Sequence, residues 1–315
     1  MRIAKLYRYP VKGLSPEPLP SVHVDAGEGF PFDRSYALLR TGAQFDPAAP
    51  VWLAKANFLM LMLHERLATL KTRFSDSDKT LEINTPDERN FSFALGEAAG
   101  RHAIEEFFAD FMPKQLPERP RLLEAAGHQF TDKAEKYVSL INLASLRELE
   151  TRWGEELDPR RFRANIYIDD AEPFSELDWI GREVCLGPVK THAALRNGRC
   201  AATNVNPETG ARDRNVPGKL RDAFGHKDLG IYLTVREGGE LREGDTVEVD
   251  SGSTEPARAE RAAAAEGQFI CTACYYLFDP RKLNPSVTNP RDLPESWRCP
   301  DCGATREAAA LAGAN

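Results

Sequence analysis

The chain has 315 residues, of which 42% are hydrophobic and 28% charged, a balance that is typical of a folded globular protein and excludes a disordered one. Its net charge of −7, from 41 Lys and Arg against 48 Asp and Glu, repels polyanions and argues against a nucleic-acid partner. The first residues lack the apolar core of a signal peptide, and the longest apolar run, 58–63, is too short to span a membrane. We therefore expect a soluble, cytoplasmic protein with no membrane partner.

Strand-like segments dominate the first 125 residues. Each is short, rich in β-branched, aromatic or aliphatic residues, and bounded by Pro, Gly or Asp. One helix interrupts them, because the residues from about 104 to 112 carry apolar side chains at helical spacing. The strands are expected at 3–11, 21–27, 34–40, 79–84 and 90–95.

Between residues 126 and 250 the pattern alternates between helix and strand. Leu146, Leu149 and Trp153 share one stripe of a helix expected over 143–154, with Asn142 placed to cap it. A shorter helix is expected from Pro217, since proline is favoured at the first helical position. Strands are expected at 164–169, 182–187, 231–236 and 245–250. The fold class predicted is mainly β (α+β), a barrel-like body in two parts that meet near residue 125, with inserted helices.

A change in composition ends this body. Residues 251–267 have almost no large apolar side chain and are expected to form a linker. Two Cys-x-x-Cys pairs follow, Cys271/Cys274 and Cys299/Cys302, with 24 residues between the pairs. Four thiolates can close a tetrahedron around one metal ion, and this geometry selects zinc or iron. The spacing alone is compatible with either metal.

The residues around these cysteines are more specific. Tyr276 and Phe278 follow the first pair, and Trp297 precedes the Cys-Pro-Asp-Cys-Gly of the second. This segment resembles the rubredoxin family, which implies a single iron held by four cysteines and passing one electron at a time. One departure is Tyr275, at a position where rubredoxins usually carry glycine, and zinc stays open as the alternative metal.

Two cysteines lie outside this segment. Cys185 falls in an alternating strand-like stretch, which indicates a small residue of a half-buried strand. Cys200 follows Arg199 in a stretch rich in Gly, Asn and Pro, and a neighbouring cation favours the thiolate. Cys200 is therefore a candidate nucleophile or metal ligand, although chemistry alone leaves open that it merely lies in a loop.

Longer motifs surround Cys200. The runs RFRANIYID and GRCAATNVNPETG resemble the MOSC domain, and YPVKGL with FPFDRSYAL resembles the β-barrel domain that precedes it in that family. The resemblance covers about residues 1–250. Together with the rubredoxin resemblance and the change in composition, it divides the chain into a MOSC N-terminal β-barrel domain at 1–125, a MOSC domain at 126–250, the linker at 251–267 and a rubredoxin-like domain at 268–310.

This second resemblance implies that Cys200 ligates the molybdenum of a pterin-based molybdenum cofactor. A soft thiolate suits that metal, and the phosphate of the cofactor calls for cationic side chains. Asn206, in a turn after Cys200, is the residue expected to approach the metal and take part in catalysis, although turn chemistry alone would also explain it. The implied cofactor-binding residues are Lys12, Gly13, Arg34, Ser145, Arg163, Asn165, Arg199 and Tyr232.

The two resemblances together predict a molybdenum-dependent oxidoreductase that reduces small N-hydroxylated compounds with electrons relayed by the rubredoxin-like iron. The sequence has no dinucleotide-binding GxGxxG, so we expect an external NAD(P)H-dependent reductase as partner. Two alternatives stay open. One is a carrier or sulfur-transfer protein for the molybdenum cofactor with a structural zinc ribbon, and the other uses that ribbon as a scaffold for a partner protein.

Overall fold

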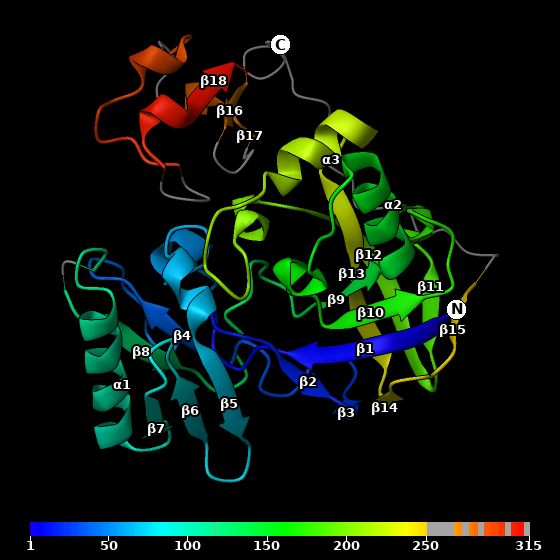
Figure 1. Cartoon of the computed structure of the whole chain (residues 1–315), viewed down its shortest axis with the longest axis horizontal. Coiled ribbons are helices and arrows are strands. Elements are labelled where there is room, and N and C mark those ends of the chain that lie inside the picture. Colours follow the sequence, from blue (N-terminus) through cyan, green and yellow to red (C-terminus); the bar gives the residue numbers. More distant parts are fainter. Residues whose placement is uncertain (117, 251–267, 273–276, 283–286, 300–303, 312–315) are drawn as a thin grey trace.

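The computed structural model describes residues 1–116, 118–250, 268–272, 277–282, 287–299 and 304–311 (Figure 1). The predicted linker, residues 251–267, lies outside this part of the chain, as do Cys274 and Cys302. Within the described ranges no helix combines the length and apolarity needed to cross a membrane.

One eight-stranded sheet forms the centre of the molecule, in the order β15-β11-β12-β13-β9-β10-β1-β2 (Figure 1). All neighbours are antiparallel except β9 and β10, which run parallel. Its apolar residues build a core that contains Leu140, Ile166 and Ile231. The strands are β1 (Arg2–Arg8), β2 (Glu17–Leu19), β9 (Val138–Asn142), β10 (Ile166–Asp169), β11 (Glu183–Leu186), β12 (Val189–Gly198), β13 (Asp228–Glu237) and β15 (Val247–Val249).

The two halves of this body share the sheet. Strand β1 comes from the N-terminal part of the chain but pairs with β10, and β3 (Ser21–Val24) pairs with β14 (Gly239–Arg242). Because these pairings have high sequence separation, periodicity along the chain does not predict them. They bring the residues that follow β1 against those that precede β10, where the Tyr9 hydroxyl donates to the Ala164 carbonyl at 3.2 Å.

A smaller set of strands forms the other part of the body (Figure 1). Its core includes Leu59, Leu61 and Phe108. Helix α1 (Ala98–Phe111) begins six residues before the expected start at residue 104. Ile104 is its first buried side chain, so the residues before it carry no apolar periodicity that would have marked the start. The strands are β4 (Tyr36–Leu39), paired with β8 (Arg121–Glu124), and the meander of β5 (Lys71–Ser75), β6 (Thr80–Asn84) and β7 (Asn90–Ala94).

The two other helices begin where the sequence predicts. Helix α2 (Leu143–Trp153) is capped by Asn142, whose Oδ1 accepts from the Ala144 amide at 3.0 Å. Helix α3 (Val216–Phe224) has Pro217 in its first turn. Their apolar faces meet in one core cluster, which covers the sheet near β9 and β10. The predicted mainly β architecture with inserted helices is confirmed.

The C-terminal segment forms a small domain around a three-stranded sheet. Strand β16 (Phe269–Cys271) lies between β17 (Leu277–Phe278) and β18 (Ala309–Leu311). The ring of Phe278 stacks on Trp297 with centroids 5.0 Å apart. Phe278 and Trp297, two of the aromatic residues that flank the cysteines in the sequence, therefore lie in the core of this domain, as the resemblance implies, and Tyr276 lies outside the described residues.

Candidate functional site

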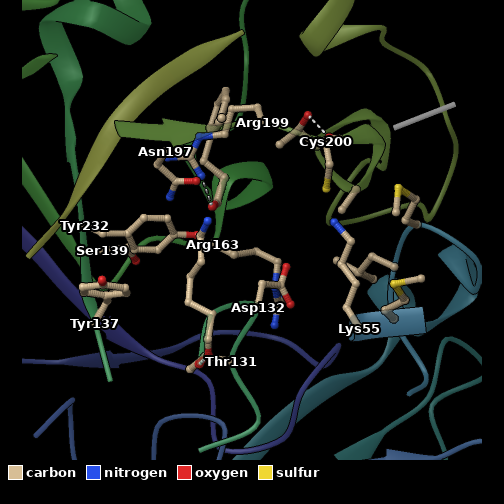
Figure 2. A pocket seen from close by; sticks show the side chains of 18 of the residues that line it. Lys55, Thr131, Asp132, Tyr137, Ser139, Arg163, Asn197, Arg199, Cys200 and Tyr232 are labelled. Carbon is tan, nitrogen blue, oxygen red and sulfur yellow. Dashed lines mark hydrogen bonds between the residues drawn. The ribbon is translucent and has the colours of Figure 1, made fainter. Parts of the chain in front are cut away.

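A pocket of about 430 Å³ lies between the two parts of the body (Figure 2). Residues from β12 and from the turn after it form one wall, and the loops that follow β1 and β8 form another. Its size falls within the range of small-molecule and cofactor sites. Eight of the predicted site residues line it: Lys12, Gly13, Arg34, Arg163, Asn165, Arg199, Cys200 and Tyr232.

Cys200 lies half-buried where β12 has ended and a 3₁₀ turn, Ala201–Asn204, begins. Its carbonyl accepts from the amide of Thr203 at 3.1 Å and from the hydroxyl of that residue at 2.9 Å. Arg161 stabilises the end of this turn, because its guanidinium donates to the Asn204 carbonyl at 3.3 Å. The thiol is thus presented to the pocket by a short turn with fixed ends.

Arg199 turns away from the neighbouring thiol. Its Nε donates to the carbonyl of Leu229 at 2.8 Å and its Nη1 to the carbonyl of Phe162 at 3.0 Å. Gly230 makes room for this packing, since its φ is +80° and a Cβ there would lie 2.2 Å from the Leu140 carbonyl oxygen. Arg199 therefore positions the Cys200 turn against β13, and burial lowers the pKa of its guanidinium.

The most unusual backbone of the site holds two arginines. Arg34 and Arg163 have φ values of 50° and 53°, in the left-handed region that residues other than glycine seldom adopt. Both guanidinium groups stack on the ring of Tyr9, at 4.4 Å and 4.3 Å from its centroid. The Arg34 side chain also donates to the Arg163 carbonyl at 2.9 Å, which couples the two strained residues. Tyr9 is fully buried, and burial raises its pKa to about 12.

The two arginines differ in their partners. Arg34 forms an ion pair with Asp33 at 2.5 Å. Arg163 donates to the Leu14 carbonyl at 2.6 Å and has no carboxylate within ion-pair distance in the part of the chain that is described. Burial lowers the pKa of Arg163 to about 10, so it stays charged at neutral pH. Asp33 and Asp132 act on it only from a distance, so a buried cation without a direct ion pair leaves room for an anion from outside the protein.

A lysine and a carboxylate meet near the arginines. Lys12 Nζ lies 2.5 Å from Asp132 Oδ1 and donates to the Phe130 carbonyl at 2.9 Å. Although burial raises it, the cations Lys12, Lys55 and Arg34 hold the pKa of Asp132 well below its usual range. Burial lowers the pKa of Lys12. Asp132 therefore stays ionised and neutralises one of the cations around it.

Three other predicted residues have a simple geometric account. Asn165 and Ser139 both line the pocket. Asn165 accepts from the Ser139 hydroxyl at 2.8 Å and so fixes its position. Burial raises the pKa of Tyr232, whose phenol therefore stays neutral and able to donate. Gly13 has a φ of +89°, and a Cβ there would lie 3.1 Å from the Leu59 carbonyl oxygen, so this position strongly favours glycine.

Two residues of the predicted site do not line the pocket. The Ser145 hydroxyl donates to the buried carboxylate of Glu176 at 2.8 Å, inside the protein core. Asn206 Oδ1 accepts from the Glu208 amide at 2.9 Å, and its Nδ2 donates to Asp213 at 2.8 Å. The side chains of Ser145 and Asn206 are thus committed to local structure.

Other residues of the pocket were missed at the level of the sequence. Lys55 is 9% exposed, and in Figure 2 its amino group points toward Cys200. A single lysine within the apolar stretch 51–63 was a signal for it. Asp132 lies in a charged segment after β8, where nothing in the sequence separates it from its neighbours. Met60 and Met62 line the pocket too, and their alternation with Leu59 and Leu61 gave no sign of this.

The tetracysteine site is described in part. Cys271 and Cys299 are 0% and 1% exposed in the core of the C-terminal domain. Burial of these two thiols fits the water-poor surroundings that tune an iron–sulfur centre. Cys274 and Cys302, the other predicted ligands, lie outside the described residues.

Two curated relatives match part of this chain. One curated relative is the mitochondrial amidoxime-reducing component 1 of Danio rerio, 33% identical over 118 residues, which are 35% of this chain and 36% of that protein. Another is the molybdenum cofactor sulfurase of Drosophila ananassae, 29% identical over 202 residues, 58% of this chain and 26% of that protein. The matched region thus spans about a third or less of these proteins. The solved YUAD protein from Bacillus subtilis has a TM-score of 0.38 and 13% identity, over 79% of this chain and 94% of that one, and supports no inference.

Family profiles match nearly the whole length. The profile of the MOSC N-terminal β-barrel domain matches residues 1–115, that of the MOSC domain matches 127–248, and that of rubredoxin matches 268–308. The pocket lies where the first two matches meet in space, with Cys200 inside the second. The chain is therefore a MOSC-domain protein, with the N-terminal β-barrel domain of that family and a C-terminal rubredoxin domain.

Proposed function

We propose that this protein is a molybdenum-cofactor-dependent reductase of small N-hydroxylated compounds, and that its rubredoxin domain relays the electrons. The observation that carries the proposal is one pocket that holds both the Cys200 thiol and the Arg163 guanidinium, which lacks a carboxylate partner among the described residues. A soft thiolate and a cation without a direct ion-pair partner among the described residues fit a cofactor that bears a metal and a phosphate. The relatives named for amidoxime reduction support the same class.

The residues of the pocket suit the cofactor in distinct ways. Cys200 would ligate the molybdenum, and Arg163, Arg34 and Lys12 would meet the phosphate. Tyr232 and Asn165 would offer hydrogen bonds to the pterin. Of these groups, only Arg163 reaches the pocket as a charged side chain without an ion-pair partner in the described structure, so it is the expected anchor for the anion.

The bound cofactor supplies two-electron redox chemistry at its metal. Reduction of an amidoxime to an amidine and water consumes two electrons and two protons. The protein contributes a fixed thiol, because Arg161 and Arg199 hold the backbone on both sides of Cys200. It also holds in place the two guanidinium groups that would meet the phosphate. Arg34 and Arg163 stack on Tyr9 and donate to backbone carbonyls.

The rubredoxin domain would supply electrons one at a time. A single iron held by four cysteines carries one electron, so each substrate molecule requires two deliveries. The reductant of that iron is an external NAD(P)H-dependent reductase, because the chain has no dinucleotide-binding fingerprint of its own. Zinc is the alternative metal, and it would abolish the relay because it has no redox chemistry. A cytoplasmic location stays a prediction.

Elemental analysis and an activity assay test this proposal together. The full-length chain, made in a host that synthesises the cofactor, should contain near-stoichiometric molybdenum and iron. With reduced viologen as donor it should convert an aromatic amidoxime to the amidine, which chromatography resolves. Zinc in place of iron would overturn the relay. Absence of both molybdenum and conversion would overturn the reductase.

One alternative deserves a direct test, since the matched sulfurase covers 58% of this chain. In a carrier or sulfur-transfer protein, Cys200 would hold a persulfide. Mass spectrometry of the peptide that contains Cys200, after labelling of the native protein with an alkylating agent, distinguishes a persulfide from a thiol. A purified protein with the persulfide and no reductase activity would favour the alternative.

A further inference from the structure

The segment that follows the 3₁₀ turn at Lys55–Asn57 has two faces. Leu59 and Leu61 belong to the core of the N-terminal part of the body. Met60 and Met62, which alternate with them, belong to a different apolar cluster and are each 6% exposed. A turn begins at Met60, whose carbonyl accepts from the amides of Leu63 and His64 at 3.1 Å and 2.8 Å. The methionines therefore pack in a different direction from the two leucines.

The cluster that contains the two methionines extends into the rubredoxin domain. It joins them and Ala201 to the aromatic core around Phe269 and Trp297. Figure 1 shows the domain above the segment that follows β12. The other members from the rubredoxin domain are Cys271, Phe278, Val287, Leu293 and Cys299. The core of this domain is therefore continuous with a wall of the pocket.

Both sulfur sites border this cluster. Cys271 and Cys299, predicted ligands of the tetracysteine metal, are buried members, and the half-buried Cys200 packs against it. Met60 and Met62 also line the pocket. An apolar contact of this kind excludes water from the space between the two sites and keeps the domain in one orientation.

We propose that the rubredoxin domain works in a docked state, with Met60, Met62 and Ala201 as its docking surface, and passes electrons to the pocket beside Cys200 within one chain. This inference rests on the proposed reductase function. An iron held by the four cysteines would go from ferrous to ferric in each transfer and give its electron to the molybdenum cofactor held at Cys200, and the external reductase would return the iron to the ferrous state. Two such transfers, with two protons from solvent, balance the reduction of one substrate molecule.

The docked state differs from a shuttle in its response to the linker. For a domain that shuttles on the linker expected at 251–267, shortening this segment slows electron transfer. A docked domain has already made its contact, so lengthening the segment with Gly and Ser residues should change the transfer rate less than twofold. Substitution of Met60 and Met62 by charged residues, in contrast, should slow the transfer strongly.

Hydrogen exchange on the full-length, metal-loaded chain tests the docking surface without relying on activity. In the double variant Met60→Lys, Met62→Lys the amides of 58–63 and 201–204 should exchange at least about tenfold faster than in the wild type, because two charges cannot stay in an apolar contact. The matched variant Met60→Leu, Met62→Leu should behave like the wild type, since leucine keeps the volume and apolarity. Trp52→Lys, at an exposed position outside the cluster, controls for added charge.

A kinetic measurement on the same proteins completes the test. In the wild type, re-oxidation of the ferrous iron after addition of substrate should be independent of protein concentration, and in the lysine variant it should slow at least about tenfold at unchanged iron and molybdenum content. Unchanged exchange and unchanged re-oxidation in the lysine variant would overturn the docked state while leaving the reductase intact. Faster exchange in a protein without molybdenum would keep the docking and overturn the reductase.

Discussion

The two walls of the pocket are built by different physics. One wall carries Arg34, Arg163 and Lys12, each fixed by hydrogen bonds to backbone carbonyls or by an ion pair. The other carries Cys200, Met60 and Met62, whose side chains belong to or pack against an apolar cluster that includes the rubredoxin domain. Directional bonds place charges to within a narrow range, whereas packing keeps water out.

The difference separates two tasks of the site. A polar cofactor with a phosphate needs preorganised cations, which the first wall supplies at the cost of two residues with left-handed backbone. Electron entry needs a water-poor contact, which the second wall supplies with sulfur and methyl groups. Substitutions at four positions test whether the tasks are in fact divided between the walls.

Cys200→Ser should have the largest effect. Loss of the thiolate removes the metal ligand, so retained molybdenum should fall by more than the roughly 10–100-fold typical of outer-shell changes, with iron content unchanged. Elemental analysis of the purified protein measures both. Molybdenum retained at the wild-type level would show that the cationic wall alone holds the cofactor.

His64 links the stability of the sulfur-lined wall to pH. The Met60 amide donates to its Nδ1 at 3.3 Å, and burial lowers the pKa of His64 to about 4 from 6.5. Between these values the unfolded chain binds a proton that the folded chain does not. The free energy of unfolding should therefore fall by about 3 kcal/mol as pH drops from 7 to 4.

Urea unfolding of the wild type and of His64→Gln at several pH values measures this contribution. The variant lacks the titrating group, so its loss of stability over the same interval should be smaller by about that amount. Equal slopes for the two proteins would show that other groups govern the acid response.

Arg163→Ala should weaken the cationic wall. A hydrogen bond to a charged group is worth about 1.5–3 kcal/mol, so the cofactor should bind roughly 10–100-fold more weakly. Arg163→Lys keeps the charge but loses the stacking on Tyr9. Its affinity for the cofactor should lie between those of the wild type and of Arg163→Ala. Titration of the apoprotein with cofactor, followed by fluorescence of the pterin, measures the affinity. An unchanged affinity in Arg163→Ala would place the phosphate elsewhere.

Ser145→Ala belongs to neither wall and should have the smallest effect. The buried Glu176 loses a donor, which should lower the free energy of unfolding by about 1–2 kcal/mol. Molybdenum content should stay at the wild-type level, since the hydroxyl faces the core. A stable protein with less molybdenum would instead restore Ser145 to the cofactor site.

The fold was predictable wherever the pattern is local. The cap at Asn142, the proline at the start of α3 and most strands follow from propensity and periodicity within a few residues. The pairing of β1 with β10 joins distant parts of the chain and was not. The start of α1 was missed because its first turn is exposed.

The site divides in the same way. Cys200, Arg34 and Arg163 were found because short motifs surround them, and the structure brings all three to one pocket. Lys55 and Asp132 were missed because a short 3₁₀ turn carries the first and a loop the second, and the packing of other elements decides where both lie. Ser145 lies in a recognisable motif, yet its hydroxyl faces the core, since the orientation of a helix is fixed by its contacts.

The amino-acid sequence determines the metal-binding residue types, the order of the domains and the short-range elements, because these depend on side-chain chemistry and on neighbours along the chain. Only the tertiary structure decides that Arg163 has no carboxylate partner among the described residues, that Arg199 faces the backbone, and that Met60 and Met62 meet the rubredoxin domain. These relations join segments far apart in sequence, and the packing of the whole chain selects them.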